Sequence, residues 1–268
     1  MSSIQIFNRK IKSIHRDRAS RNFPKYNFLI NDISNNFIET LSEDINFKFN
    51  SILDLGGKSG LLDEFILSKK PQIFLKNAVF DSCSNKNSND GLKVSFDEEF
   101  LPFDKESFDL VYSTLDLHWV NDLPGCLIQI KNILRKDGLF LCSILGGQTL
   151  SELRAVITSV ESRMRDGAAP RISPMIGTKD AGALLQRAGF ALPVVDSEVI
   201  KILYKDVKSL VADLRGMGET NALLNSANIP LNRSIWQSVE QEYKKKFSTD
   251  EGLIYATFEV LNLIGWKN

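Results

Sequence analysis

Cysteine and histidine, the residues of most disulfide and metal sites, are scarce in this chain of 268 residues. The three cysteines, Cys83, Cys126 and Cys142, stand far apart without paired spacing, which argues against a disulfide framework and a zinc site. The two histidines, His15 and His118, fall in separate regions, so an iron site of two histidines and one carboxylate is not expected. We therefore expect no metal centre, and a reducing compartment.

Long apolar runs and an excess of one charge are also missing. No apolar run reaches the roughly 18 residues that would span a membrane, and no secretory signal is visible. Lysine and arginine total 33 and are balanced by 33 acidic residues, so nothing favours a nucleic-acid partner. Apolar residues make up 43% of the chain, enough for one large globular domain or two small ones.

The charge is nevertheless uneven, because the start of the chain is basic. Its positive residues are Arg9, Lys10, Lys12, Arg16, Arg18, Arg21 and Lys25. Apolar residues at Ile4, Phe7, Ile11 and Ile14 have the spacing of an amphipathic helix that packs on the body of a protein. Attachment of this helix to a membrane surface or to a partner subunit is the alternative.

Strand-like and helix-like segments alternate along most of the chain. Residues 1–46 have helical periodicity and are expected to form an N-terminal helical extension. The expected strands are 49–55, 74–80, 92–96, 108–114, 138–145, 192–196, 199–204 and 256–266. The expected helices are 60–69, 123–134, 150–164, 180–188, 207–215 and 234–246. The alternation predicts an α/β domain over 47–268, whose parallel sheet is covered on both faces, with a lid-like insert at about 147–180.

The most informative segment reads S-I-L-D-L-G-G-K-S-G and begins at Ser51. An apolar strand ends in Asp54 and runs into Gly56, Gly57 and Gly60, and a helical pattern follows at once. At such a turn glycine lets the backbone approach a nucleotide-like ligand closely. The pattern D-x-G-x-x-x-G resembles the first motif of class I S-adenosylmethionine (SAM) methyltransferases, with a lysine in place of the middle glycine. A turn with a purely structural role is the alternative.

Acidic residues follow the second and third expected strands. Asp81, followed by Ser82, ends the second strand, where a carboxylate can accept both ribose hydroxyls of an adenosine. Asp97 and Glu98 follow the third strand, where a carboxylate can accept the adenine amino group. The alternatives are a helix cap for Asp81 and a solvated loop for the other two. Because Gly56, Asp81 and Asp97 would meet at the carboxyl edge of the sheet, we interpret them together as a cofactor site.

The fourth expected strand leads into S-T-L-D-L-H-W-V-N-D-L-P. We expect Ser113 and Leu115 beside the sulfur end of the cofactor, and His118 and Trp119 toward the mouth of the pocket. A structural role is the alternative for His118, and Trp119 fits core or pocket wall better than catalysis. Ser-His-Asp catalysis is not expected, because no G-x-S-x-G turn is present. The catalytic group stays unassigned.

Further stretches resemble one protein family over essentially the whole chain. They are D-E-E-F-L-P-F (97–103), F-D-L-V (108–111), L-H-W-V-N-D-L-P (117–124), G-G-Q-T-L-S-E-L-R (146–154), I-S-P (172–174), L-L-Q-R-A-G-F (184–190), G-M-G-E-T-N (216–221) and I-G-W-K (264–267). The family is that of the mitochondrial complex I assembly factor that hydroxylates an arginine, with its alphaproteobacterial relatives. The resemblance implies a class I SAM-methyltransferase (Rossmann-like) fold with a seven-stranded, mostly parallel sheet, and SAM as cofactor. It also implies a protein substrate, an arginine on an iron–sulfur subunit of respiratory complex I.

The resemblance assigns roles to single residues. The glycine motif falls on the family's first motif, Asp81 on its ribose acid and Asp97 on its adenine-side acid. Lys58 stands where the family has glycine, and Gly57 where it has cysteine. Lys58 would either clash with the cofactor or pair with its methionine carboxylate, and the sequence leaves both open.

The resemblance also bears on origin and location. The family's mature start matches Ile6 onward, so only five residues precede it and a presequence is not expected. With the usage rich in asparagine, lysine and isoleucine, this resembles a bacterial protein. We expect it in the cytoplasm, with peripheral association on the inner membrane face as a further expectation.

Two other functions stay open. The stretch T-L-S-E-L resembles G-T-L-x-E-L of the malonyl-carrier-protein methyltransferases of biotin synthesis, which should lack G-M-G-E-T-N and I-G-W-K. The other is a non-catalytic assembly chaperone, which the lysine in the glycine motif motivates.

Overall fold

The protein is described here from a computed structural model. The structure describes residues 5–44, 47–58, 61–77, 92–165, 167–224 and 230–268. The expected roles of Gly60, Asp81 and Ser82 therefore lie outside the described residues.

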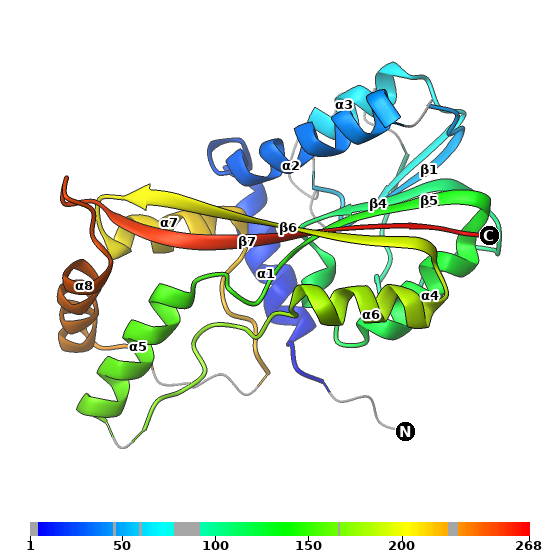
Figure 1. The fold of residues 1–268 in the computed structure, drawn as a ribbon. Coiled ribbons are helices and arrows are strands. Elements are labelled where there is room, and N and C mark those ends of the chain that lie inside the picture. Colours follow the sequence, from blue (N-terminus) through cyan, green and yellow to red (C-terminus); the bar gives the residue numbers. More distant parts are fainter. Residues whose placement is uncertain (1–4, 45–46, 59–60, 78–91, 166, 225–229) are drawn as a thin grey trace.

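One mixed sheet organises the chain (Figure 1). Its strands are β1 (Ser51–Leu55), β2 (Ile73–Asn77), β3 (Leu92–Val94), β4 (Phe108–Thr114), β5 (Leu134–Leu145), β6 (Ala191–Tyr204) and β7 (Ile254–Trp266). They lie in the order β3-β2-β1-β4-β5-β7-β6, with β1 to β5 parallel and β7 antiparallel to both of its neighbours. The order reverses between β1 and β4, and open α/β sheets bind ligands beyond the carboxyl ends of the strands at such a point. The predicted seven-stranded α/β fold is confirmed.

Helices cover both faces of the sheet. They are α1 (Arg9–Ser20), α2 (Phe28–Glu39), α3 (Leu61–Ser68), α4 (Leu123–Ile133), α5 (Ser151–Met164), α6 (Thr178–Ala188), α7 (Val207–Met217) and α8 (Arg233–Phe247), with short helical turns η1 (Phe23–Lys25), η2 (Thr40–Asp44) and η4 (Leu117–Trp119). Strand side chains alternate between two apolar layers. Along β1, Ile52 belongs to the layer with α2, α3, α7 and α8, whereas Leu53 and Leu55 belong to the layer with α4 and α6. Figure 1 shows α2 and α3 on one side of the sheet and α4 and α6 on the other.

The segment before α1 is tied to the body by its backbone. Phe7 pairs with Leu223 in an antiparallel bridge. The side-chain oxygen of Asn121 accepts hydrogen bonds from the N–H groups of Ile6 and Phe7, each at 2.7 Å. The same amide donates back to the oxygen of Phe7 at 3.3 Å, so Asn121 fixes the entry of the chain into α1.

The buried face of α1 is mostly polar, which corrects the expected apolar face. Lys12, Arg16 and Ala19 are buried, whereas Ile14 is 53% exposed. Buried charges are tolerated only when they are paired, so the basic residues of this helix face acidic partners on the body. The helix packs on the body as expected, but ion pairs hold much of its inner face.

Two other boundaries differ from expectation. The segments 192–196 and 199–204 form a single strand, β6, which pairs with β7 from Val194 to Tyr204. β6 is an edge strand with many exposed side chains, so its polar positions at 197 and 198 do not interrupt it. β5 begins at Leu134, directly after α4, and includes the turn residues at 136–138. Among the described residues, no helix is long and apolar enough to cross a membrane.

Two helical glycines give a matched test of how closely the N-terminal segment packs on α7. A Cβ at Gly216 in α7 would overlap the ring of Tyr26, whereas a Cβ at Gly182 in α6 would find its nearest neighbour at 3.9 Å. Alanine favours a helix over glycine by roughly 1 kcal/mol. We expect Gly182→Ala to raise the free energy of unfolding, and Gly216→Ala to lower it by about 1–3 kcal/mol through overpacking. Urea denaturation measures both, and stabilisation by Gly216→Ala would contradict this packing.

Candidate functional site

The glycine turn after β1 packs against the residue that follows β4. Gly56 and Gly57 have φ angles of +104° and +60°, which glycine adopts without strain. A Cβ at Gly56 would lie 2.7 Å from the Cβ of Asp116, so a side chain does not fit there. Asp116 is fully buried. The turn has the close approach that its sequence predicts, and its near neighbour is a carboxylate.

Lys58, the departure from the glycine motif, points into the protein. Its ammonium donates to the backbone oxygen of Leu115 at 2.5 Å and to Glu219 Oε1 at 2.7 Å. Burial lowers the pKa of Lys58 to about 8, although the Glu219 carboxylate acts in the opposite direction. The lysine is therefore anchored to the end of β4 and to the end of α7.

Glu219 gathers hydrogen-bond donors from two parts of the chain, the glycine turn and the segment after β4. Besides Lys58, it accepts from Trp119 Nε1 at 2.8 Å, and His118 Nε2 lies 2.8 Å from the same oxygen, Oε2. Burial opposes its charge, but the ammonium of Lys58 and the contact with His118 outweigh burial and hold the pKa of Glu219 well below its usual range. We call these four residues the Glu219 cluster. A buried carboxylate is stable in such a setting because its oxygens are satisfied.

His118 is buried, which corrects its expected place at the mouth of the pocket. Its side chain is 3% exposed, and burial lowers its pKa below the usual 6.5 against the effect of Glu219, so the ring is neutral at pH 7. A neutral ring that keeps its hydrogen on Nε2 for the carboxylate leaves Nδ1 as an acceptor. Nδ1 has no hydrogen-bond partner within the part of the chain that the structure describes.

Trp119 is a core residue, the role its sequence favoured over catalysis. Its ring packs edge-to-face against Phe7, with ring centroids 5.2 Å apart, and it is 2% exposed. The indole N–H donates a hydrogen bond to Glu219. Trp119 therefore links the N-terminal segment to the Glu219 cluster.

Cations from α1 reach the same edge of the sheet. Arg16 contacts Asp116 and lies 3.4 Å from Glu98 Oε1, and Lys12 lies 3.2 Å from Asp116 Oδ1. Arg9 pairs with Glu98 as well. Burial opposes the charge of Glu98, but Lys12, Arg16 and Arg9 outweigh burial and hold its pKa well below its usual range. The helix is thus attached through the acids that follow β3 and β4.

The two acids expected on the adenine side differ in burial. Glu98 is buried, whereas the side chain of Asp97 is 46% exposed and pairs with Arg9 at 2.6 Å. We use the name α1 cluster for this set of charges: Arg9, Lys12, Arg16, Asp97, Glu98 and Asp116.

Asp54 and Ser113, both expected beside the cofactor, are buried in their strands. Burial, with the nearby charge of Asp63, raises the pKa of Asp54 well above its usual range. Its Oδ2 atom has no partner among the described residues. Leu115 contributes its backbone oxygen to Lys58.

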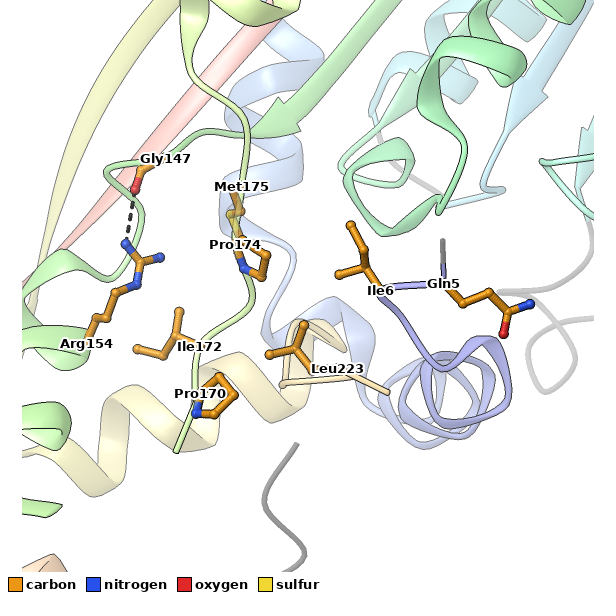
Figure 2. A pocket seen from close by; sticks show the side chains of 9 residues that line it. All are labelled: Gln5, Ile6, Gly147, Arg154, Pro170, Ile172, Pro174, Met175 and Leu223. Carbon is orange, nitrogen blue, oxygen red and sulfur yellow. Dashed lines mark hydrogen bonds between the residues drawn. The ribbon is translucent and has the colours of Figure 1, made fainter. Parts of the chain in front are cut away.

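Three cavities lie beside these clusters. The α1 cavity, of about 190 Å³, is lined by residues of α1 and by 96–98. The His118 cavity, of about 260 Å³, is lined in part by His118. The groove, of about 630 Å³, lies between Arg154 and Ile172 on one side and Ile6 on the other (Figure 2). The groove and the His118 cavity share Ile6, Pro174 and Met175.

Comparison with known proteins identifies the family. Residues 26–193 match the family model of a methyltransferase domain. The chain is 35% identical to the mitochondrial arginine-hydroxylase NDUFAF5 of Danio rerio over 269 residues, which is 98% of this chain and 83% of that protein. The chain belongs to the NDUFAF5 arginine-hydroxylase family.

Other similarities cover less of the chain or show the fold alone. A malonyl-[acyl-carrier protein] O-methyltransferase of Gallionella capsiferriformans is 32% identical, over 66% of this chain and 58% of that protein. The structure of loganic acid methyltransferase with S-adenosylhomocysteine has a TM-score of 0.59 at 12% identity, and covers 93% of this chain and 96% of that one. The class I methyltransferase fold is therefore confirmed, and the match to NDUFAF5 extends beyond it along nearly the whole chain.

Several site residues of this NDUFAF5 relative escaped sequence reasoning. Glu219 lies in the family stretch G-M-G-E-T-N but received no role, and Asp116 lies between Leu115 and His118 without having been singled out. Lys12 and Arg16 are four residues apart and so share one face of α1. That spacing was the available signal, since two basic residues on the inner face of a helix require acidic partners.

The described residues fit SAM in their chemistry. Lys12 and Arg16 offer cations for a carboxylate, and Asp97 and Glu98 offer acceptors for amino groups. The unpartnered Asp54 Oδ2 below the glycine turn is a further polar atom of this edge. The α1 cavity, at about 190 Å³, is smaller than the roughly 300–1,000 Å³ of small-molecule sites. Admission of the whole cofactor therefore requires side chains of the α1 cluster to rearrange.

The buried Lys58 makes stability depend on pH in a defined direction. Its pKa is about 8 in the folded protein and 10.5 as the reference value, so between these pH values the unfolded chain holds a proton that the folded chain has released. Below pH 8 the folded protein bears the full free-energy cost of burying the charged ammonium. This cost falls as the pH rises and Lys58 loses its proton. Relative to Lys58→Met, the free energy of unfolding of the native protein should rise by up to about 1.4 kcal/mol per pH unit between pH 8 and 10.5.

Chemical unfolding of both proteins across this pH range measures the difference. Lys245→Met, at an exposed position on α8, controls for removal of a lysine as such. If the difference in free energy of unfolding between the native protein and Lys58→Met does not change with pH, Lys58 is not desolvated.

Proposed function

We propose that this protein binds SAM beyond the carboxyl ends of β1 to β4 and modifies an arginine side chain of a protein substrate. The observation that carries the proposal is the Glu219 cluster: a carboxylate from the stretch G-M-G-E-T-N meets His118 and Trp119 at the carboxyl end of β4. Open α/β sheets bind ligands at this edge. The relative from Danio rerio that matches 98% of the chain is named an arginine hydroxylase.

SAM would lie between the glycine turn and α1. Gly56 and Gly57 let the backbone come close. Lys12 and Arg16 contact Asp116, which packs against Gly56, so they bring positive charge to this turn. The cofactor supplies an activated methyl group or a sulfonium centre to the reaction. The chain supplies orientation, exclusion of water and a fixed charge pattern, which are the main protein contributions to group transfer.

The proposed substrate is an iron–sulfur subunit of respiratory complex I, modified in the cytoplasm or at the inner face of the membrane. Three cations of the basic start already face the body in the α1 cluster, which favours the packed helix over the membrane-bound one. Lys10, Arg18, Arg21 and Lys25 are exposed and form the part of the N-terminus that can meet a partner or a lipid surface.

The malonyl-carrier-protein methyltransferase is the second candidate, because a relative of that name matches 66% of the chain. Its match is shorter than that of the arginine hydroxylase, so we rank it second. SAM-dependent methylation of a malonyl carrier protein by the purified protein would favour it.

Calorimetry with SAM tests the cofactor part of the proposal. We expect the native protein to bind SAM, and Lys58→Gly to bind it with the same affinity, because Glu219 and the Leu115 carbonyl hold Lys58 away from the glycine turn. Binding by Lys58→Gly alone would mean that the native chain has lost the cofactor and acts as a scaffold. Binding by neither would overturn the proposed site.

Mass spectrometry of the iron–sulfur subunit tests the reaction. In a strain lacking the gene, we expect the arginine to lose its modification and assembly of complex I to fall. The increment that disappears, an oxygen or a methyl group, distinguishes hydroxylation from methylation. An unchanged arginine together with normal assembly would refute the proposal, whereas an unchanged arginine with defective assembly would indicate a chaperone.

A further inference from the structure

The His118 cavity is apolar except for two side chains. Its walls include Ile6, Phe7, Leu117, Pro174, Met175 and Leu184, and the polar side chains among its lining residues are His118 and Asn121. The amide of Asn121 already makes hydrogen bonds with the backbone of Ile6 and Phe7. Both lone pairs of the Asn121 oxygen are used, and its NH₂ group can only donate, so of these two polar side chains His118 is the one with an acceptor left.

The remaining capacity of His118 is an acceptor. Nε2 faces the Glu219 carboxylate, which can only accept, so the ring hydrogen lies on Nε2. Nδ1 then carries a lone pair, and it has no partner among the residues that the structure describes. An unsatisfied buried acceptor costs roughly 1–3 kcal/mol. Nδ1 is itself buried, so an occupant with an N–H or O–H donor relieves this cost where it reaches the ring from the cavity.

The shape of the cavity suits one side chain that enters from an extended segment. Its volume of about 260 Å³ is below the usual range for whole small-molecule ligands. Through Ile6, Pro174 and Met175 it adjoins the groove, which is larger and open (Figure 2). A polypeptide lying in the groove would therefore have the His118 cavity directly beside it.

We propose that the His118 cavity is the subsite that receives the arginine side chain of the protein substrate, with His118 Nδ1 accepting a guanidinium N–H. The apolar walls cover the methylene groups of the arginine, and Glu219 acts through the ring by fixing its tautomer and supplying negative charge behind it. His118 is thus a recognition residue and Glu219 a positioning residue. This inference rests on the proposed function, because it places the substrate of that reaction.

The chemistry favours arginine over other long side chains. A guanidinium is planar and more weakly hydrated than an ammonium, so it loses less than lysine does on entering an apolar cavity with one acceptor. An uncharged hydrocarbon chain of the same length would contact the apolar walls but would leave Nδ1 without a hydrogen bond. Hydrogen-bonded chains such as carboxylate–imidazole–guanidinium strengthen one another in a low-dielectric interior.

The test uses four peptides that differ in one residue: N-acetyl-Gly-X-Gly-amide with X as arginine, citrulline, lysine or norleucine. Citrulline keeps the N–H donors without the charge, and norleucine keeps only the hydrocarbon. Binding is followed by the ¹⁵N signals of the histidine rings in the presence of SAM. The chain has only two histidines, so the spectrum is simple, and His15, whose Nδ1 lies 2.8 Å from the Thr220 hydroxyl, is an internal reference.

We expect the arginine peptide to shift His118 Nδ1 in the direction of hydrogen-bond acceptance, while the His15 ring stays unchanged. Citrulline should bind more weakly, and lysine and norleucine should give no Nδ1 shift. His118→Phe, which keeps a ring in the wall, should weaken arginine binding about 10- to 100-fold, as for loss of a hydrogen bond to a charged group. His15→Phe is the matched control, and SAM affinity with thermal unfolding verifies that each variant folds.

Three results would overturn the subsite. If the norleucine peptide binds as tightly as the arginine peptide and neither shifts the Nδ1 signal, the cavity is only an apolar pocket. Equal arginine affinity in His118→Phe and native protein would remove the ring from recognition. If the native protein modifies the intact iron–sulfur subunit and His118→Phe does so with an unchanged KM, the arginine binds elsewhere. Only the proposed function then stands. Conversely, an arginine-dependent Nδ1 shift in a protein that neither binds SAM nor modifies the subunit would keep the subsite and refute the proposed function.

Discussion

The buried carboxylate of Glu219 is the constraint on which the site depends. It lies in a dry interior, so its charge is tolerable only while Lys58, His118 and Trp119 all point at it. These residues come from the glycine turn after β1 and from the segment after β4, whereas Glu219 follows α7. One carboxylate thereby fixes the relative positions of the cofactor edge and the cavity beside it. Removing it would take the carboxylate acceptor away from the buried ammonium of Lys58.

The α1 cluster extends this charge pattern to the N-terminus. Lys12 and Arg16 reach Asp116, which packs on Gly56, and Arg16 and Arg9 reach Glu98. The helix therefore belongs to the site and is not an appendage of it. Its apolar content alone does not explain its packing, because Ile14 on the same helix is exposed. Ion pairs replace part of the apolar contact, and they place cations where the proposed cofactor carries a carboxylate.

Two sides of one sheet edge then have different chemistry. On the β1 side, charged groups surround the glycine turn and leave a cavity of about 190 Å³. On the β4 and β5 side, the His118 cavity is apolar with a neutral imidazole in its wall. A charged cofactor suits the first and an amphipathic side chain suits the second. Glu219 and His118 join them, because His118 touches the carboxylate through one nitrogen and lines the apolar cavity.

Local residue patterns predicted most of the fold. The strand at 108–114 was predicted with its observed bounds, and the glycine turn was found where Asp54, Gly56 and Gly57 stand. The division of β6 was wrong because an edge strand with polar residues at 197 and 198 looks interrupted in sequence. The expected apolar face is confirmed at Phe7 and Ile11, which pack in the cluster of Trp119, and was wrong at Ile14, because the inner face of α1 is otherwise basic. The sequence left His118 open between the mouth of the pocket and a structural role, since one histidine gives no periodic signal of its depth.

By itself, the sequence determined the alternation of strands and helices, the place of the glycine turn and the strand ends at which a site can form. These follow from side-chain periodicity and backbone freedom, which act over a few residues. Only the tertiary structure decided the partners of the charges. Lys58 meets Glu219 from 161 positions away, and Arg16 meets Asp116 across the fold. Pairing over such separations depends on how the helices dock, because the Coulomb attraction and the cost of burial are set by distance in space.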